Sequence, residues 1–496
     1  MTLVTTPQVN KGPFLGVGRA AWTLSVLVLW LCQGILTRAA LERFHYEDLA
    51  ESIRNPYWLS HHILYDGTSS NVGWYGTLLA LYETFGFSLS TAKVFRWALQ
   101  LPSLLCLAAL LRRHLPENRG LVLLWLVGLS PTLQFFTSMQ TSFGIDLQLV
   151  PILLWLLVQP HVFDVGPRGG LWNVVVGVLV MWGSFSYPVM LLYGPPLAAL
   201  YLFLWHRSGT SPRALVQGVV GVVGGMAVVL GGALAWLRYP MNLLRDPHSG
   251  EWSLFVGGGG AMHLHPRVLH WGMVKSFTDL FVRPLSYAFD LPHVEFGTPL
   301  GWIGVGVITV VTLQQYRQRW SRRDVTFWVL SVALLAFFVG LIMPHTSQNT
   351  PGLRRATPML VGAWAAAGVL LALPPTERAA RAMWRACQLL VLHHVVVFPL
   401  NVVDLAQLPR SNDHFLGLAG TPSESLSVVM ERVARGEPLR CEKLGGECRY
   451  SEIYGALSGY RRWNDLPLLK VTAWDPDRQE LLELTPSVWE SYRLAH

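Results

Sequence analysis

The sequence predicts an all-α polytopic membrane protein with about eleven transmembrane helices, and two observations carry this prediction. Apolar residues occupy 52% of the 496 positions and charged residues only 14%, against roughly 25% charge in an average soluble protein. A soluble chain of this length would have several charged domain surfaces, and so little charge cannot solvate them. The apolar residues are also gathered in long stretches. The composition excludes intrinsic disorder, collagen and a disulfide-rich miniprotein.

The predicted spans are eleven apolar stretches bounded by charge or by Pro and Gly. In chain order they are Ala20 to Leu36, Ala92 to Leu111, Leu121 to Phe136, Ile145 to Val158, Leu171 to Phe185, Val189 to Trp205, Ala214 to Leu237, Leu300 to Leu313, Val325 to Met343, Met359 to Leu373 and Met383 to Leu400. Several are shorter than the ~20 residues that a helix needs to cross a bilayer, so we expect flanking Trp, Tyr and Ser to form interfacial ends. No ionisable residue is expected at the midpoint of any span. The first stretch has no small-residue cleavage site after it and is expected to be a retained signal anchor.

The distribution of Lys and Arg predicts the orientation of these spans. With residues 1–19 in the cytoplasm, positive charge is about three times denser in the inward segments than in the outward ones, as the positive-inside rule requires. The net charge of +8 therefore needs no nucleic-acid partner. The transmembrane domain covers residues 20–403. The outward segments are the loops 38–90, 238–298 and 344–356 and the C-terminal domain 404–496.

The first outer loop contains two features. Gly73 to Phe85 is apolar, but counting it as a span would invert every later loop, so we predict an interfacial helix anchored by Trp74, Tyr75 and Tyr82. An acidic pair, Glu47 and Asp48, precedes it on the polar side of a second predicted helix. A carboxylate held at the bilayer surface could act as a general base on a lipid-borne substrate. A solvated helix face is the alternative.

Other ionisable residues lie near the predicted outer ends of spans. Placing the ionisable side chain of Asp146 in a span costs free energy, which makes it a functional candidate. A helix cap or an interfacial hydrogen bond is the alternative. Lys93 and Arg96 begin the second span, where they bind a lipid phosphate or extend to the interface. Arg354 and Arg355 oppose the positive-inside bias, so we expect a phosphate between them, with a salt bridge to Asp146 or Glu47 as the alternative. Two further outer-loop residues are assigned to this site, Lys275 as a phosphate ligand and His345 as a supporting residue.

The remaining outer motifs predict less chemistry. Four glycines at 257–260 lack the Lys-Ser/Thr of a P-loop and predict a flexible loop. Histidines at 61–62 and at 263, 265 and 270 could bind a divalent metal, but no carboxylate lies at a typical ligand spacing, so we expect no metal and no cofactor. Cys441 and Cys448 are expected to form a local disulfide outside the membrane. Leu468 to Trp474 and Glu480 to Leu484 predict two strands around a turn, within a small mixed α/β domain.

These features resemble a known family. The acidic pair after span one, Phe85-Gly86-Phe87-Ser88 and Leu101-Pro102-Ser103 are similar to motifs of the C-fold polytopic glycosyltransferases that use lipid-phosphate sugars. Ser130-Pro131, Gly144-Ile-Asp146 and Arg354-Arg355-Ala-Thr-Pro358 resemble further landmarks of its protein O-mannosyltransferase and aminoarabinose transferase group. The chain departs from that group in the order Glu47 then Asp48, in Gln100 where an Arg is usual, and in Arg355 where a Tyr often follows the late Arg.

The resemblance implies an inverting hexosyl- or pentosyltransferase in a bacterial inner (plasma) membrane. Its donor would be a polyprenyl-phosphate sugar at the outer leaflet, and its acceptor a lipid, a glycan or a protein. Asp48 or Glu47 would be the base, and the guanidinium groups would neutralise the phosphate. A transporter or lipid flippase is the alternative, and a scaffold subunit is a third. A flippase would be expected to have ionisable or helix-breaking residues near span midpoints and an internal inverted repeat, and the sequence shows neither clearly.

Overall fold

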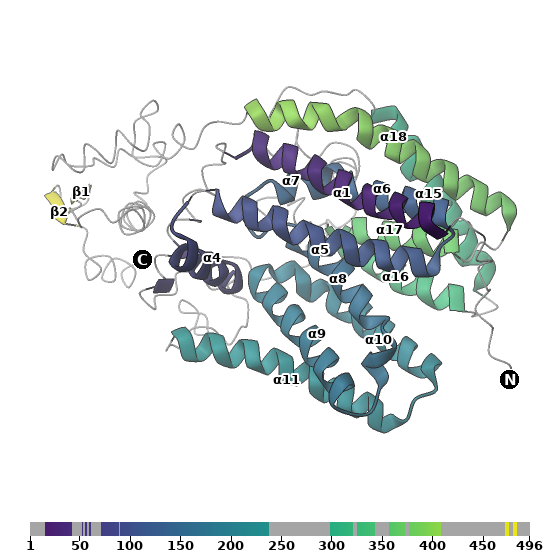
Figure 1. Cartoon of the computed structure of the whole chain (residues 1–496), viewed down its shortest axis with the longest axis horizontal. Helices are drawn as coiled ribbons and strands as arrows, with labels where there is room; N and C mark the ends of the chain where they lie inside the picture. Colours follow the sequence, from purple (N-terminus) through teal and green to yellow (C-terminus); the bar gives the residue numbers. More distant parts are fainter. Residues whose placement is uncertain are drawn as a thin grey trace.

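The computed structural model describes most of the predicted transmembrane domain. The described residues are 15–41, 52, 55, 56, 59, 60, 71–88, 90–237, 298–320, 325–342, 357–372, 376–407, 472–475 and 480–483. These residues are almost all helical, which confirms the predicted α class for this part of the chain. Most of the long helices run lengthwise through the molecule (Figure 1).

The helices follow the predicted apolar stretches in order. They are α1 (Leu15–Ala39), α4 (Val72–Phe85), α5 (Thr91–His114), α6 (Glu117–Gly128), α7 (Pro131–Thr137), α8 (Ile145–Leu157), the 3-10 helix η1 (Pro160–Phe163), α9 (Pro167–Ser186), the 3-10 helix η2 (Pro188–Tyr193), α10 (Gly194–Ser208), α11 (Pro212–Leu237), α15 (Thr298–Arg319), α16 (Val325–Ile342), α17 (Thr357–Ala372) and α18 (Glu377–Gln407). Among the described residues, six helical segments are long and apolar enough to span a membrane, and a bent pair makes a seventh. This pattern is that of an integral membrane protein, whereas the count of eleven spans stays a prediction.

The predicted third span is broken. The stretch Leu121 to Phe136 forms two helices, α6 and α7, which are bent by 49° relative to each other. Ser130 lies at the break with an extended ψ of 123°. The cause is Pro131, because proline disfavours helical geometry in the residue before it and has no N–H to donate.

Two apolar cores fill the bundle. The first is formed mainly by α1, α6, α7, α15, α17 and α18, and the second mainly by α4, α8, α9 and η2. Helix α5 contributes Leu104 and Leu107 to the first core and Ala92 to the second. A reciprocal tryptophan pair attaches α5 to α1, since the rings of Trp30 and Trp97 stack at 4.3 Å and each indole N–H donates to the other's backbone carbonyl at 3.0 Å. The helix that joins the two cores is thus held in register with α1.

Helices α9 and α11 pack through glycines. A Cβ added at Gly177 would lie 2.0 Å from the backbone oxygen of Val222, and one at Gly225 would lie 2.1 Å from that of Val174. Small residues allow this close backbone approach, which is a common way for membrane helices to associate.

We expect Gly177→Ala to separate α9 from α11 and to lower the free energy of unfolding by about 1–3 kcal/mol, because the added methyl meets backbone that cannot rotate away. The melting temperature in detergent measures this loss. Gly224→Ala is the matched control in α11, where an added Cβ meets nothing within 4 Å. Alanine favours helix over glycine, so the control should melt at the same temperature or higher. Equal melting of both variants would contradict the packing role of Gly177.

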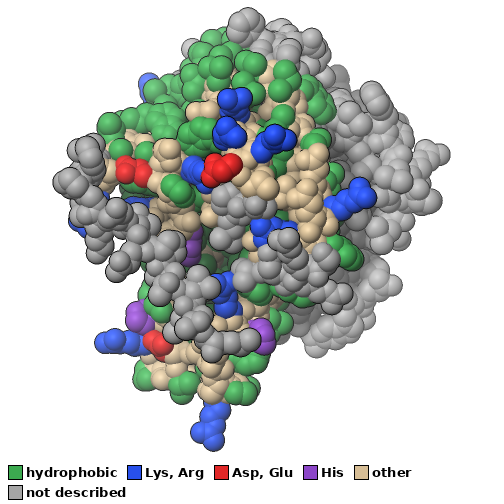
Figure 2. Space-filling model, turned by 90° about the vertical axis from the view of Figure 1, so that its right-hand side faces the viewer, with side chains coloured by type: hydrophobic (Ala, Val, Ile, Leu, Met, Phe, Trp, Pro, Cys, Tyr) green, Lys and Arg blue, Asp and Glu red, His purple; other side chains and the backbone are tan. Residues whose placement is uncertain are grey.

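Side-chain hydrogen bonds tie the helix ends together at both ends of the bundle. At one end, the Lys93 ammonium donates to the last turn of α1 at the Ala40 carbonyl, and the Ser90 hydroxyl donates to the Leu41 carbonyl. At the other end, the Arg119 guanidinium donates to the Leu371 carbonyl. This second end carries many Lys and Arg side chains and few acidic ones (Figure 2). It is the end to which the positive-inside analysis assigns Arg119.

The predicted hairpin near the C-terminus is present as two short antiparallel strands. Strand β1 (Thr472–Asp475) pairs with β2 (Glu480–Glu483), with Asp475 opposite Glu480. The rest of the predicted outer domain, including Cys441 and Cys448, lies outside the described residues. Among the described cysteines, Cys32, Cys106 and Cys387 are free thiols, and Cys387 is fully buried.

Candidate functional site

Arg96 is fully buried near the start of α5. Its Nε donates to the Gln148 side-chain oxygen at 2.6 Å. Its Nη1 donates to the carbonyls of Thr141 and Phe143 at 2.7 and 3.1 Å. The guanidinium therefore organises the turn between α7 and α8. In the described part of the chain its Nη2 has no hydrogen-bond partner.

Asp146 is fully buried in the first turn of α8, where the helix dipole favours a negative charge. Gly144 directs the chain into this helix with a φ of +68°, and a Cβ there would meet Phe136 at 2.6 Å. Asp146 Oδ2 accepts a hydrogen bond from the Tyr193 hydroxyl at 2.7 Å. The Thr357 side chain lies beside Asp146. Oδ1 has no hydrogen-bond partner among the described residues.

Gln148 supports both charged groups. Its amide nitrogen donates to the Arg96 carbonyl at 2.8 Å and to the Gln100 side-chain oxygen at 3.0 Å, while its oxygen accepts from the Arg96 guanidinium. Gln100 occupies the position where the resembled family usually has an arginine, and here it completes a hydrogen-bonded chain between α5 and α8. We call Arg96, Asp146, Gln148, Tyr193 and Thr357 the polar centre.

Lys93, by contrast, is not part of the polar centre. Its side chain is 2% exposed and its ammonium caps α1 at the Ala40 carbonyl. Lysine at the C-terminus of a helix is stabilising because it interacts with the orphan carbonyls and with the dipole. Of the two basic residues at the start of α5, Arg96 joins Asp146 and Lys93 holds two helices together.

The aromatic residues of α4 pack within the protein. Trp74, Tyr75 and Tyr82 are 0%, 2% and 3% exposed, so their role differs from the predicted interfacial anchoring. The Trp74 indole donates to the Gln140 carbonyl at 3.1 Å, and its ring lies 5.8 Å from the Arg96 guanidinium carbon. Burial raises the pKa of the Tyr82 phenol above its ordinary value. Helix α4 therefore forms one wall of the polar centre.

An apolar cavity of about 340 Å³ leads away from the polar centre. Residues of α5, α6, α8, α10, α16 and α17 line it. Tyr193, whose hydroxyl binds Asp146, is among the lining residues, and so is His114, at the C-terminus of α5. The rest of the lining is almost entirely aliphatic, with Val150, Leu154 and Val369 as examples. Such a cavity suits a long hydrocarbon chain whose polar head lies beside Asp146.

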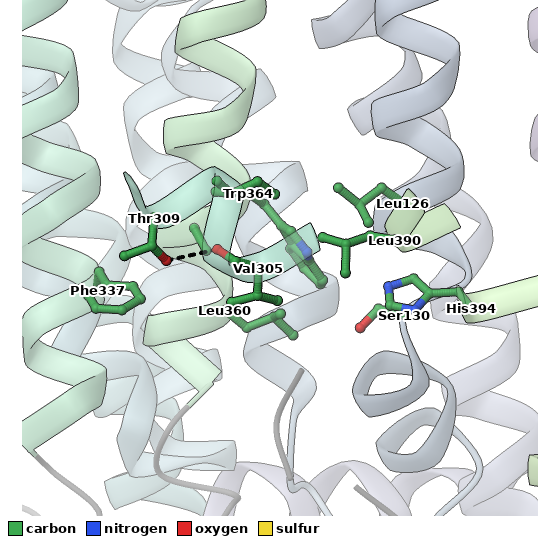
Figure 3. A pocket seen from close by; sticks show the side chains of 11 residues that line it. Leu126, Ser130, Val305, Thr309, Phe337, Leu360, Trp364, Leu390 and His394 are labelled. Atoms are coloured by element: carbon green, nitrogen blue, oxygen red, sulfur yellow. Dashed lines mark hydrogen bonds between the residues drawn. The ribbon is translucent and has the colours of Figure 1, made fainter. Parts of the chain in front are cut away.

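A second polar feature lies near the middle of α18. His393 and His394 are buried, and their Nδ1 atoms are 3.0 Å apart. Figure 3 shows the His394 ring beside Ser130, at the break between α6 and α7, and both line a cavity of about 20 Å³. The expectation that no span has an ionisable midpoint is therefore wrong. Two adjacent histidines inside the stretch Met383 to Leu400 were a visible signal of this pair.

Several predicted site residues lie outside the described residues. They are Glu47, Asp48, Lys275, His345, Arg354 and Arg355. Arg355 precedes Thr357 by two positions in the chain, and Thr357 is the first residue of α17 and lies beside Asp146. Within the described part of the chain, no group of three or more His, Cys, Asp or Glu side chains could hold a metal ion.

The fold and these sites define a class. The chain is a helical integral membrane protein with a buried polar centre near one end of the bundle and an apolar cavity that begins there. Comparison with known protein families, with characterised proteins and with solved structures found no match in any of the three. Its activity is therefore inferred from the site.

Proposed function

We propose that this protein is a membrane glycosyltransferase that moves a sugar from a polyprenyl-phosphate carrier to an acceptor at the outer face of a bacterial inner membrane. The proposal includes eleven spans, a cytoplasmic N-terminus and an outer C-terminal domain. The observation that carries it is the junction at Tyr193, which hydrogen-bonds Asp146 and also lines the apolar cavity. A lipid-phosphate sugar needs both environments, since its head is polar and its tail is hydrocarbon.

The proposed reaction is an inverting displacement at the anomeric carbon. A carboxylate, Asp48 or Glu47, takes the proton of the acceptor hydroxyl while that oxygen forms a bond to the anomeric carbon. The bond from this carbon to the carrier phosphate breaks, and the electron pair leaves with the phosphate. Arg354 and Arg355 neutralise the negative charge that develops there. The products are the glycosylated acceptor and the polyprenyl phosphate.

We expect Ala365→Phe to weaken binding of a long-chain polyprenyl phosphate about ten-fold or more, measured with the purified full chain in detergent. Ala365 lines the cavity and is eight residues along α17 from Thr357, about 12 Å at the rise of an α-helix. The phenylalanine ring would displace the hydrocarbon tail of the carrier but not its phosphate head, so a short-chain prenyl phosphate should bind as it does to the parent. Ala109→Phe, on an exposed position of α5, is the matched control.

Arg354→Ala and Arg355→Ala form the complementary arm, because they remove phosphate ligands. Both should weaken long and short carriers alike, with the melting temperature unchanged, whereas a structural salt bridge would lower the melting temperature. Arg→Lys variants keep the charge but lose bidentate geometry. Unaltered carrier binding in the Ala365→Phe, Arg354→Ala and Arg355→Ala variants would refute a carrier site here.

The flippase alternative has its own observation in its favour, namely the His393–His394 pair beside the broken α6–α7 helix. Ionisable groups and broken helices near span midpoints are typical of transporters. Incubation with radiolabelled polyprenyl-phosphate sugars separates the two functions. The transferase releases polyprenyl phosphate and labels an acceptor, whereas a flippase in proteoliposomes moves the intact lipid between leaflets and consumes none of it.

A further inference from the structure

A cluster of buried polar atoms without partners surrounds the turn between α7 and α8. Gln140 is 1% exposed, and in the described part of the chain neither atom of its carboxamide has a hydrogen-bond partner. The same holds for the Thr141 hydroxyl, Arg96 Nη2 and Asp146 Oδ1. Buried polar groups are nearly always hydrogen-bonded, and an unmade bond costs folding free energy. Five such atoms within one short segment and its partners point to a ligand.

These atoms belong to one structural unit. Arg96 donates to the carbonyls of Thr141 and Phe143, and Trp74 donates to that of Gln140. Asp146 lies two residues after Gly144, in the first turn of α8, and its charge is opposite to that of Arg96. The backbone of the turn is therefore held by hydrogen bonds, while the polar side-chain atoms of Gln140 and Thr141 have no partner among the described residues. The backbone framework of a site is thus fixed, and the unpartnered side-chain atoms are the groups that a ligand could satisfy.

The chemistry of the five atoms selects the ligand. Gln140 Nε2 and Arg96 Nη2 only donate hydrogen bonds, Gln140 Oε1 and Asp146 Oδ1 only accept them, and the Thr141 hydroxyl does both. A ligand that satisfies all of them must also donate and accept, which hydroxyl groups do. An ammonium group only donates and a carboxylate only accepts. The opposite charges of Arg96 and Asp146 already balance, so a charged ligand would leave one buried charge uncompensated.

We propose that Gln140, Thr141, Arg96 and Asp146 bind the hydroxyl groups of an uncharged sugar, so that the donor carries a neutral hexose or pentose and not an amino sugar or a sugar acid. This inference rests on the proposed function, because the site is next to the cavity assigned to the carrier tail. The five atoms are enclosed in the ligand-free chain, so binding requires local opening of the site.

The test compares three ligands on the purified full chain: polyprenyl phosphate, polyprenyl-phosphate mannose and polyprenyl-phosphate aminoarabinose. We expect mannose to strengthen binding about ten-fold or more over the bare carrier, and aminoarabinose to add nothing. Gln140→Leu and Thr141→Val should each weaken binding of polyprenyl-phosphate mannose by about three- to ten-fold, since each deletes hydrogen bonds to a sugar hydroxyl. Neither should alter the affinity for the bare carrier.

Stability provides the second readout. Since the deleted groups have no partner in the part of the chain that the structure describes, Gln140→Leu and Thr141→Val should melt at or above the temperature of the parent. Gln315→Leu is the matched control, because Gln315 lies in α15 and its side-chain oxygen is likewise buried without a described partner. It should leave the gain from mannose intact.

The outcomes separate this inference from the proposed function. Failure of the parent to bind any of the three lipids would refute the proposed function and with it the sugar site. Equal binding of all three, or preference for aminoarabinose, would refute the sugar site alone. If the gain from mannose persists while Gln140→Leu and Thr141→Val both lower the melting temperature, the atoms bind structural water, and the sugar site is again refuted.

Discussion

Asp48→Asn should lower sugar transfer by ~10² or more while the protein still folds and binds its carrier. Asparagine keeps the size and much of the hydrogen bonding of aspartate but cannot accept a proton, so the acceptor hydroxyl would lose its base. Initial rates with a radiolabelled polyprenyl-phosphate sugar measure the loss. Binding of polyprenyl phosphate should be unchanged, which separates a chemical role from a binding role.

Two variants at neighbouring acidic residues, Glu51→Gln and Glu47→Gln, show whether the loss is specific to Asp48. Glu51→Gln removes an acidic group from the same outer segment and should leave transfer intact. If Asp48→Asn retains near-normal turnover and Glu47→Gln loses it, the base is Glu47, in the alternative assignment of the pair. Retention of transfer in both Asp48→Asn and Glu47→Gln would exclude acid–base catalysis by this loop.

Arg96→Met should lower the free energy of unfolding by about 3–5 kcal/mol, because it leaves buried groups without partners. Asp146 would lose the opposite charge of Arg96, its buried counterpart among the described residues, and the Gln148 oxygen and the carbonyls of Thr141 and Phe143 would each lose a donor. The melting temperature in detergent, or resistance to denaturant, measures the effect. The stability of Arg96→Lys should lie between that of the parent and that of Arg96→Met, since one ammonium group cannot replace a guanidinium that donates to three acceptors.

Arg113→Met is the matched control at the opposite end of the same helix. Its guanidinium is exposed and makes one long hydrogen bond of 3.4 Å to the Val158 carbonyl, so the substitution should change stability by under about 0.5 kcal/mol. Similar melting of the Arg96→Met and Arg113→Met variants would show that the polar centre does not stabilise the turn between α7 and α8.

The sequence by itself determined the class of the protein and the order of its helices. Long apolar stretches predict membrane helices because the free energy of moving a stretch from water into the bilayer depends on the residues of that stretch alone. The charge bias also predicts the orientation of the helices in the membrane, which stays a prediction. Arg96 and Asp146 were identifiable as candidates for a simple reason, namely that an ionisable residue in an apolar helix is costly.

Only the tertiary structure decided what those two residues contact. Tyr193 is 47 positions from Asp146 in the chain, and a partner at such a distance is set by helix packing, which no local pattern encodes. Packing likewise directed Lys93 to the end of α1 and left the Gln140 carboxamide without a hydrogen-bond partner among the described residues. Hydrogen bonds depend on distance and angle to within tenths of an ångström, whereas an apolar pattern specifies only the face that a helix buries. The sequence therefore identified the charged candidates, and the packing of the helices determined which of them form a site.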